Sequence, residues 1–313
     1  MENGTRTSCC YYSLNRYLQD RFGEKVYKLA LDGGFTCPTR DGMLDTRGCI
    51  FCSGGSGDFA VSVGDDAAAA IEAAKKVVEG KAGRKYIAYF QRFTGTYAPP
   101  DRLRSLYTQS ILHPDVVALS IATRPDCLPD NTVALLSELN RIKPVWAELG
   151  LQTVHETTAE YIRRGYPLSV YDDAVRRLHA AGIMVIVHMI LGLPGETPDM
   201  MVETARYIGQ SGADGIKFQL LHVLKGTDLA EDYCKGRFQV LSLDEYVQIL
   251  ESCVEAIPAD MVVHRLTGDG AKRDLIAPLW SADKKHVLNE IKRAFARDRI
   301  QQGRLASAAF RKA

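Results

Sequence analysis

Short apolar runs alternate along the chain with longer stretches in which apolar residues recur every three or four positions. The short runs are rich in Val, Ile and Leu and predict strands buried in a sheet, whereas the longer stretches predict amphipathic helices. Strands are expected at residues 26–31, 86–90, 116–121, 145–151, 183–190, 215–221 and 261–266. Helices are expected at residues 12–21, 65–79, 100–112, 130–140, 169–181, 198–211, 242–257 and 284–299.

The order of these elements indicates an α/β protein with a parallel sheet. Six consecutive strand-then-helix units, followed by one more strand, favour right-handed crossovers. A complete barrel needs eight units, so we predict a partial (β/α)6 TIM-like barrel. A doubly wound open sheet is the alternative, but no dinucleotide-binding glycine fingerprint follows the first strand. We expect the barrel at residues 25–258, with an N-terminal helical extension at 1–24 and a C-terminal strand and basic helix at 259–313.

The overall charge of the chain is close to zero. Its 313 residues include 39 Lys and Arg against 38 Asp and Glu, which leaves a formal net charge of +1. This balance argues against a protein that coats nucleic acid through bulk charge. Residues 260–313 nevertheless hold twelve Lys or Arg and six Asp or Glu, so this end is either a surface for phosphates or a solvated basic helix.

Nothing in the sequence predicts export or a membrane span. The N-terminal residues are polar and lack the apolar run of a signal peptide. The longest apolar stretch, residues 183–193, is shorter than the roughly 20 residues that cross a bilayer. We therefore expect a cytoplasmic protein without a membrane partner. Clustered cysteines in such a chain are more typical of metal or redox sites than of disulfides.

A long, glycine-rich connection follows the first predicted strand and carries three cysteines. Cys37, Cys49 and Cys52 have the spacing C-x11-C-x2-C. Three thiolates can hold a four-iron cluster and leave one iron open for a small chelating molecule. A closed zinc site needs a fourth ligand, which Cys9, Cys10 or Cys127 could supply. The remaining thiols are expected to be core or incidental residues.

Polar residues gather where the predicted strands end. In parallel α/β architectures, catalytic groups lie at the carboxyl ends of the strands. The residues at or just beyond these ends are Asp32, Gln91, Thr123, Arg124, Glu148, Gln152, His188, His222, Lys225 and Arg265.

The cysteine loop and several flanking segments resemble a known enzyme group. The segments include KVYKLALDGGFTCPTRDG, GCIFCSGGSGDFA, ELGLQTVHE and GLPGET, and the similarity runs over residues 16–291. The chain resembles the radical S-adenosylmethionine superfamily, and within it the YhcC-like family, which is related to the radical domain of the elongator catalytic subunit. The common superfamily spacing is C-x3-C-x2-C, so this chain departs from it in the first interval.

The resemblance implies that Cys37, Cys49 and Cys52 hold a [4Fe–4S] cluster whose open iron binds S-adenosylmethionine. One electron, from a flavodoxin- or ferredoxin-type donor, would then yield a 5′-deoxyadenosyl radical. Gln152 and Arg164 match superfamily residues that contact S-adenosylmethionine. By their positions at strand ends, Gln91, Thr123 and Gly192 are further candidates for cofactor contacts.

Substrate-contacting residues are predicted by position alone. The catalytic candidates are Glu148, His188, His222 and Lys225, with Arg265 and Asp269 beside them. Each has a structural alternative: Arg164 could be a surface charge, His188 a core residue, Gly192 an ordinary turn and Asp269 a turn-shaping residue.

The resemblance also suggests a reaction. Members of the YhcC-like family are associated with C–N cleavage that leaves an aminomethyl group. We predict such cleavage in the side chain of a tRNA wobble uridine. The alternative substrate is a free queuine-type base, released during queuosine salvage. A non-catalytic iron–sulfur or zinc module that binds RNA or senses redox state is the third possibility.

Overall fold

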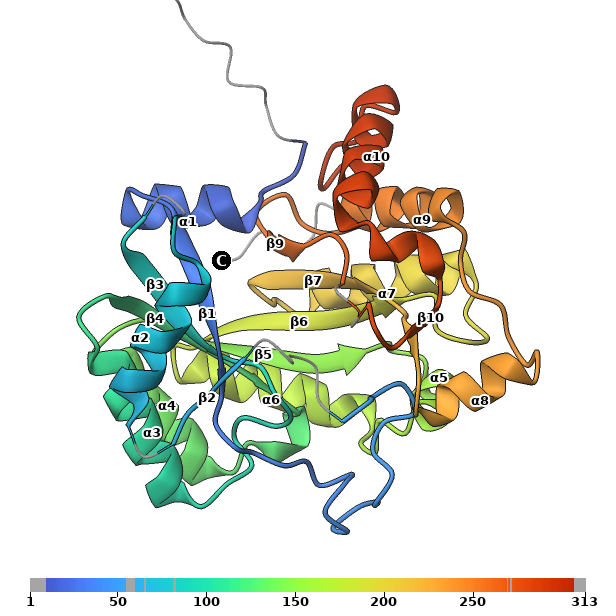
Figure 1. Ribbon diagram of the computed structural model, residues 1–313. Helices are drawn as coiled ribbons and strands as arrows, with labels where there is room; N and C mark the ends of the chain where they lie inside the picture. Colours follow the sequence, from blue (N-terminus) through green and yellow to red (C-terminus); the bar gives the residue numbers. More distant parts are fainter. Residues whose placement is uncertain are drawn as a thin grey trace, which may run out of the picture.

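The computed structural model describes residues 10–54, 60–64, 66–80, 83–268, 270 and 272–306. An eight-stranded sheet forms its centre, in the order β2-β1-β3-β4-β5-β6-β7-β9 with every pair parallel (Figure 1). The strands are β1 (Val26–Asp32), β2 (Val61–Ser62), β3 (Lys85–Phe90), β4 (Val116–Thr123), β5 (Val145–Gln152), β6 (Met184–Leu191), β7 (Gly215–Leu220) and β9 (Val262–Arg265). The sheet curls into a half-barrel whose edges are β2 and β9, which confirms the predicted partial barrel.

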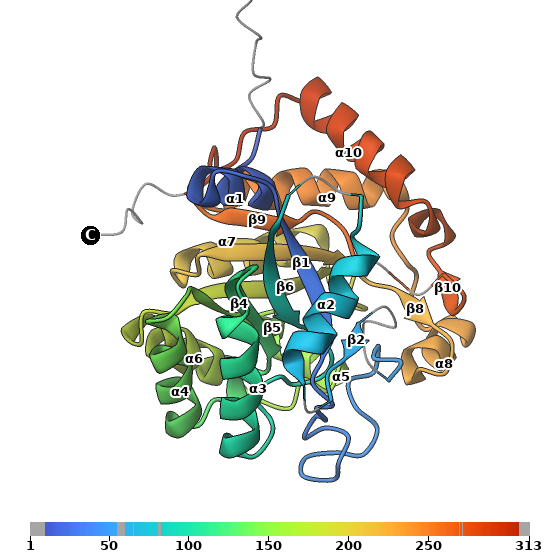
Figure 2. The ribbon, with the colours of Figure 1, turned by 60° about the vertical axis from the view of Figure 1, so that its left-hand side comes forward.

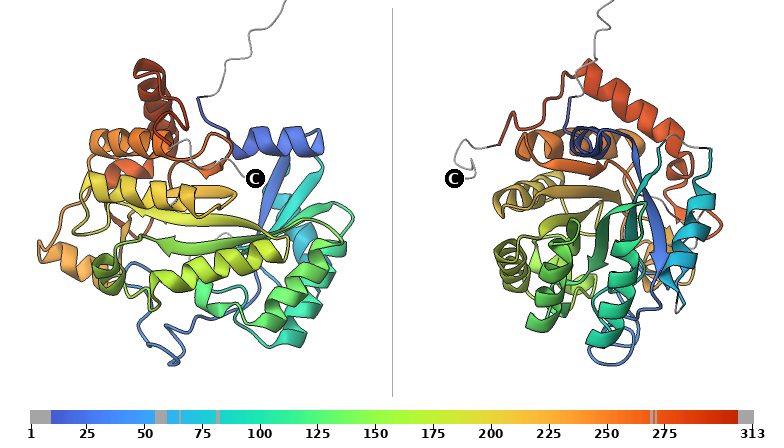
Figure 3. Two further views of the ribbon diagram at one scale, coloured as in Figure 1. Left: turned by 180° about the vertical axis from the view of Figure 1, so that it is seen from behind. Right: turned by 90° about the vertical axis from the view of Figure 1, so that its left-hand side faces the viewer.

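Helices cover the outer face of the curled sheet (Figures 2 and 3). The helices are α1 (Leu14–Phe22), α2 (Ala67–Val77), α3 (Pro100–Leu112), α4 (Asp130–Asn140), α5 (Glu156–Tyr161), α6 (Leu168–Ala180), α7 (Pro198–Gln210), α8 (Asp228–Cys234), α9 (Leu243–Ala256) and α10 (Lys284–Arg297). Capping side chains fix the start of some of these helices: at α9, Ser242 and Glu245 form a reciprocal capping box. The large core between helices and sheet includes Leu29 and Leu31 of β1.

Helix α1 closes one end of the half-barrel. Leu18 packs there against the inward-facing side chains of an apolar layer, which consists of Val26, Ile87, Ala118, Trp146 and Ile186. The cysteine loop, residues 33–54, lies at the opposite end in every view (Figures 1 and 2). Parallel strands place all their carboxyl ends on the side of that loop, as the sequence predicts.

Several short elements were not predicted from the sequence. They are β2, the antiparallel pair β8 (Val223–Leu224) and β10 (Leu275–Ala277), the helices α5 and α8, and two 3₁₀ turns at Pro125–Cys127 and Leu279–Ala282. Two- and three-residue strands are too short to show a period, and neighbouring segments decide whether they pair. Among the described residues, no helix has both the length and the apolarity needed to cross a membrane.

Candidate active site

Backbone hydrogen bonds hold the cysteine loop over the strand ends. The amide of Ile50 donates to the carbonyl of Ile162 after β5, at 3.2 Å, and the carbonyl of Ile50 accepts from the amide of Leu229 in α8, at 3.1 Å. The amide of Thr94, beyond β3, donates to the carbonyl of Thr36 at 3.2 Å. The loop is thus tied to three separate parts of the half-barrel, which presents its cysteines in defined positions.

The three cysteines are free thiols and lie partly buried. The Sγ of Cys49 is 3.8 Å from the carbonyl oxygen of Arg163, and the Sγ of Cys37 is 3.1 Å from the hydroxyl of Thr39. Burial raises the pKa of the Cys49 thiol to about 12, against the opposing effect of Arg124. Cys52 and Cys37 also act on the Cys49 charge, so the three thiols face a shared region.

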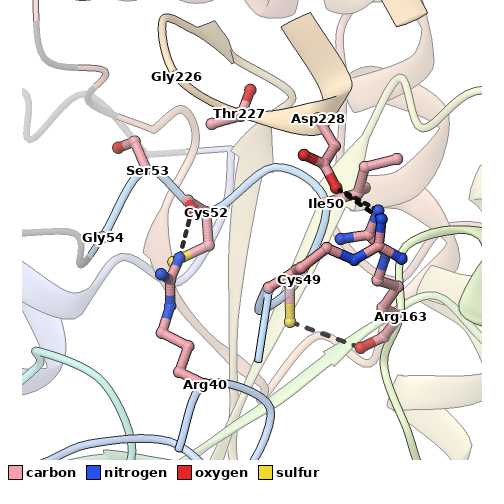
Figure 4. A pocket seen from close by; sticks show the side chains of 11 residues that line it. Arg40, Cys49, Ile50, Cys52, Ser53, Gly54, Arg163, Gly226, Thr227 and Asp228 are labelled. Atoms are coloured by element: carbon pink, nitrogen blue, oxygen red, sulfur yellow. Dashed lines mark hydrogen bonds and ion pairs between the residues drawn. The ribbon is translucent and has the colours of Figure 1, made fainter. Parts of the chain in front are cut away.

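Arginines surround these thiols. A cavity of about 160 Å³ beside Cys49 and Cys52 is lined by the side chains of Arg40, Arg47 and Arg163. Arg40 donates to the carbonyl of Cys52, and the Arg163 carbonyl lies beside Cys49 (Figure 4). Asp228 also lines the cavity and pairs with Arg47 and Arg163, so three arginines face one carboxylate. Because thiolates that hold iron concentrate negative charge, the remaining positive charge of this lining suits a loaded cluster.

The spacing of the sulfurs favours a cluster over a single ion. Tetrahedral zinc binds its sulfurs at about 2.3 Å, which brings them within about 4 Å of one another. Among the described residues, only Glu72, His113 and Asp115 bring three ligand atoms within 4.8 Å of one another. At least one pair of the three loop sulfurs is therefore more than 4.8 Å apart, which is wider than one tetrahedral ion requires and suits the larger [4Fe–4S] group. The Glu72 group is an ion-pair network, because Lys75 bonds to both of its carboxylates.

The candidates for a fourth zinc ligand differ in position. The backbone carbonyl of Cys10 accepts a hydrogen bond from the amide of Gln302, whose side chain donates to the carbonyls of Pro258 and Met261. These residues precede β9, so Cys10 lies at the end of the half-barrel away from the cysteine loop. Cys127 is buried and electrostatically close to Cys37, and burial raises the pKa of its thiol to about 12. Cys9 lies outside the described residues.

Two of the predicted cofactor contacts have unsatisfied buried amide groups. The Nε2 of Gln91 and the Oε1 of Gln152 are buried, and no described residue bonds to either atom. Gln152 also has a φ of 71°, which is costly for a residue with a side chain. Its amide folds over Gly150, where a Cβ would lie 3.0 Å from the Gln152 Nε2. Buried polar groups normally find partners, so both side chains suit a polar ligand such as a nucleoside.

The other predicted cofactor contacts already have partners within the protein. The Thr123 hydroxyl pairs with that of Thr96 at 2.5 Å. Arg164 is buried and donates to the Thr153 carbonyl at 2.7 Å and to the Glu156 carboxylate at 3.0 Å, so the alternative of a surface charge is wrong. Gly192 has a φ of 88°, a conformation that favours glycine. Their contacts with a cofactor stay predictions.

Glu148 and His188, predicted as catalytic residues, meet in the interior of the half-barrel. The side chain of Glu148 has no solvent exposure and accepts from His188 Nε2 at 2.9 Å and from the Ser120 hydroxyl at 2.6 Å. Lys28 bonds to its Oε1 atom and Lys217 to its Oε2 atom. We call these residues, with Tyr89, the ionic cluster: Lys28, Tyr89, Ser120, Glu148, His188 and Lys217.

Sequence reasoning missed both lysines of the ionic cluster. Each is a charged residue that lies between two apolar or aromatic residues of its strand, β1 or β7, and this pattern is a usable signal for an inward-facing charge. Burial alone would raise the pKa of Glu148, but Lys217 and Lys28 outweigh it and hold the pKa well below its usual range. Burial, and then Lys217, lower the pKa of His188 to about 4, so its imidazole is neutral at neutral pH.

The remaining predicted substrate residues lie outside the ionic cluster. His222 packs beneath two glycines beyond β9: a Cβ at Gly270 would lie 3.0 Å from its ring. Lys225 is exposed on the small β8–β10 sheet, and its amide donates to the Asp274 carbonyl at 2.8 Å. Arg265 acts electrostatically on both cluster lysines and so lies near them. Asp269 lies outside the described residues.

Known proteins resemble this chain over most of its length. Residues 46–208 match the radical SAM superfamily, and residues 213–297 match the radical SAM C-terminal domain. YtqA of Bacillus subtilis is 47% identical over 296 residues, which cover 94% of this chain and 92% of that protein. YhcC of Escherichia coli is 35% identical over 277 residues, which cover 88% and 89% of the two chains.

More distant relatives include elongator-type proteins. A tRNA uridine(34) acetyltransferase of Methanocaldococcus jannaschii is 26% identical over 156 residues, or 49% of this chain and 28% of that protein. The structure of the Methanocaldococcus infernus Elp3 superimposes with a TM-score of 0.68 at 17% identity, covering 88% of this chain and 64% of that one, and so shares the fold. By sequence and by the three-cysteine loop on a parallel half-barrel, the chain belongs to the radical S-adenosylmethionine superfamily and is a relative of YtqA and YhcC.

Proposed function

We propose that the protein is a radical enzyme that cleaves a C–N bond in the side chain of a tRNA wobble uridine and leaves an aminomethyl group. The observation that carries the proposal is the combination of family membership with similarity to a tRNA uridine(34) acetyltransferase. The fold shared with the archaeal Elp3 extends over 88% of the chain and supports this relationship.

The residues of the site support a radical reaction. Cys37, Cys49 and Cys52 would hold a [4Fe–4S] cluster, while Gln91 and Gln152 would bind S-adenosylmethionine. When bound, these cofactors supply the 5′-deoxyadenosyl radical. Tyr89 of the ionic cluster lies in β3, and Gln91 follows the end of that strand. We expect the proton-carrying groups of the cluster to lie near the predicted cofactor site.

Radical formation is tested by reconstituting the protein anaerobically with iron and sulfide and adding dithionite and S-adenosylmethionine. We expect 5′-deoxyadenosine as a product. Cys49→Ala should lose the iron chromophore and at least about 100-fold of this activity, because one of three cluster ligands is missing. Cys234→Ala, which removes an exposed thiol outside the loop, is the matched control and should retain both. Full activity of Cys49→Ala would contradict the assignment.

The substrate is tested by comparing modified nucleosides from cells with and without the gene. Loss of the aminomethyl form of the wobble uridine, with accumulation of its substituted precursor, is expected. A change confined to free queuine-type bases would instead support the second candidate, which the net charge of only +1 favours. If neither pool changes, both substrates are wrong.

A further inference from the structure

Arg163 occupies a backbone position that glycine usually takes. Helix α5 ends in a Schellman motif: the amide of Arg163 donates to the carbonyl of Glu160 at 3.0 Å. The next amide, of Arg164, donates to the carbonyl of Ala159 at 2.9 Å. Arg163 thereby takes the left-handed conformation, with a φ of 57°, in which a Cβ atom is disfavoured. A residue that departs from the local preference without a local gain points to a use of its side chain.

The Arg163 side chain joins the cysteine loop to helix α8. Its Nη1 atom donates to the carbonyl of Gly48 at 3.4 Å, and its Nη2 atom pairs with the carboxylate of Asp228, the first residue of α8. The Sγ of Cys49 lies 3.8 Å from the Arg163 carbonyl oxygen (Figure 4). The side chain and the backbone of Arg163 therefore contact two consecutive residues of the loop.

Cys49 is held through both of its neighbours in the chain. Ile50, which follows it, is fixed by the backbone hydrogen bonds of its amide and its carbonyl. Gly48, which precedes it, is held by the guanidinium of Arg163. Loss of this guanidinium would therefore release one side of Cys49 and leave the other side attached.

The ion pair of Arg163 lies near the surface of the half-barrel. The side chain of Asp228 is 40% exposed and that of Arg163 is 20% exposed. Arg47 lies 3.6 Å from the same carboxylate oxygen, but its own side chain is 65% exposed. Ion pairs with this exposure contribute little to the stability of a whole domain. Because loop segments open at a lower free energy than the domain unfolds, the pair should act on local opening of the loop.

We propose that Arg163 is a positioning residue for the iron site, which clamps Gly48 to α8 and so holds the Cys49 sulfur in place as a cluster ligand. Asp228 is the anchor of this clamp. The inference goes beyond the proposed function, because it concerns how the cluster is held and does not depend on the substrate. Without the clamp, the segment around Cys49 opens more often, and both the iron and the thiol become accessible.

The first test measures the loss of iron from the anaerobically reconstituted protein to a strong Fe(II) chelator. Arg163→Gly should release iron at least about fivefold faster than the wild type, because hydrogen bonds from a charged group are lost. Asp228→Asn should have a smaller effect, and Arg163→Lys should restore part of the retention. Asp173→Asn, which removes an acid from an exposed ion pair on α6, is the control and should release iron at the wild-type rate.

The second test uses the metal-free protein. Cys49 of Arg163→Gly should react with iodoacetamide at least about fivefold faster than Cys49 of the wild type, as measured by mass spectrometry of its peptides. Cys253, which is buried in α9, should react at an unchanged rate. The Tm should stay the same or rise, because glycine relieves the left-handed position at the end of α5.

A wild-type rate of Arg163→Gly in either assay would overturn the proposal, as would a wild-type protein that takes up no iron. A Tm several degrees lower, or faster alkylation of Cys253, would also overturn it, because Arg163 would then stabilise the fold as a whole. Both assays are made without substrate. A failure of the proposed C–N cleavage therefore leaves their results unchanged, and the two proposals are tested separately.

Discussion

Two layers of side chains on the inward face of the same strands have opposite character. The layer next to α1 is apolar and consists of Val26, Ile87, Ala118, Trp146 and Ile186. Two residues farther along each of these five strands, the ionic cluster begins with Lys28, Tyr89, Ser120, Glu148 and His188. Side chains on a strand return to the same face every second residue, so the two layers are stacked directly.

The two layers contribute differently to the stability of the fold. The apolar layer removes hydrocarbon from water and stabilises the closed end of the half-barrel. The ionic cluster buries charges whose desolvation offsets much of their mutual attraction. A protein under selection for stability alone would continue the apolar layer. The charges next to the predicted cofactor site are therefore the part of the interior that suits a function.

The largest effect is expected from removal of the one acid in the ionic cluster. Glu148→Gln removes the carboxylate to which both buried lysines bond, which should lower the free energy of unfolding by about 3–5 kcal/mol. Urea denaturation measures this loss, and Glu231→Gln, an exposed acid, is the control. Lys28→Met, which leaves Glu148 bonded to Lys217, should cost far less. Equal losses in Glu148→Gln and Lys28→Met would contradict the role of Glu148 as the carboxylate shared by the two lysines.

A smaller change in the free energy of unfolding is expected when the pH is lowered, and we expect it to arise in the ionic cluster. The pKa of His188 is about 4 in the folded protein, below the value near 6.5 of an unfolded chain. The unfolded state therefore takes up a proton first, and stability falls as pH drops below 6.5, until the folded state is protonated near pH 4. At pH 5 this contributes a loss of about 1–2 kcal/mol relative to pH 7.

The measurement compares urea denaturation of the wild type and His188→Gln at pH 7 and pH 5. Other groups titrate in both proteins, so the difference between the two pH dependences isolates His188. The wild type should lose more stability than the variant. Identical pH dependences would show that His188 is not held neutral by its surroundings.

The smallest effect is expected in the apolar layer. Ile186→Val removes one buried methylene from the layer and should cost about 0.5–1.5 kcal/mol, without changing the pH dependence of stability. Urea denaturation at pH 7 and pH 5 measures both quantities. A changed pH dependence in Ile186→Val would mean that the two layers do not act separately.

The sequence predicted the strands well because their signal is local. Seven predicted strands are present, and the helices Pro100–Leu112 and Asp130–Asn140 have the predicted bounds. The cysteine loop was equally easy to predict, because its three thiols lie within 16 residues of sequence. Continuous apolar runs and closely spaced cysteines need no knowledge of distant segments.

The residues that form the interior site were harder to predict. Glu148 and His188 were selected as strand-end residues, but the structure places them in the middle of β5 and β6. Lys28 and Lys217, in the same layer, were missed because each lies near the start or middle of its strand. The same positional rule selected Lys225, which is exposed. A rule based on strand ends locates the rim of a barrel but says nothing of the layers beneath it.

For this protein, the sequence by itself determined the succession of strands and helices, the family and the three candidate iron ligands, because periodicity and motif spacing are properties of short segments. Only the tertiary structure decided that Lys28, Glu148, His188 and Lys217, which are spread over four strands, share one layer. That grouping depends on the register between neighbouring strands. Register is set by packing between distant segments, and no local pattern encodes it.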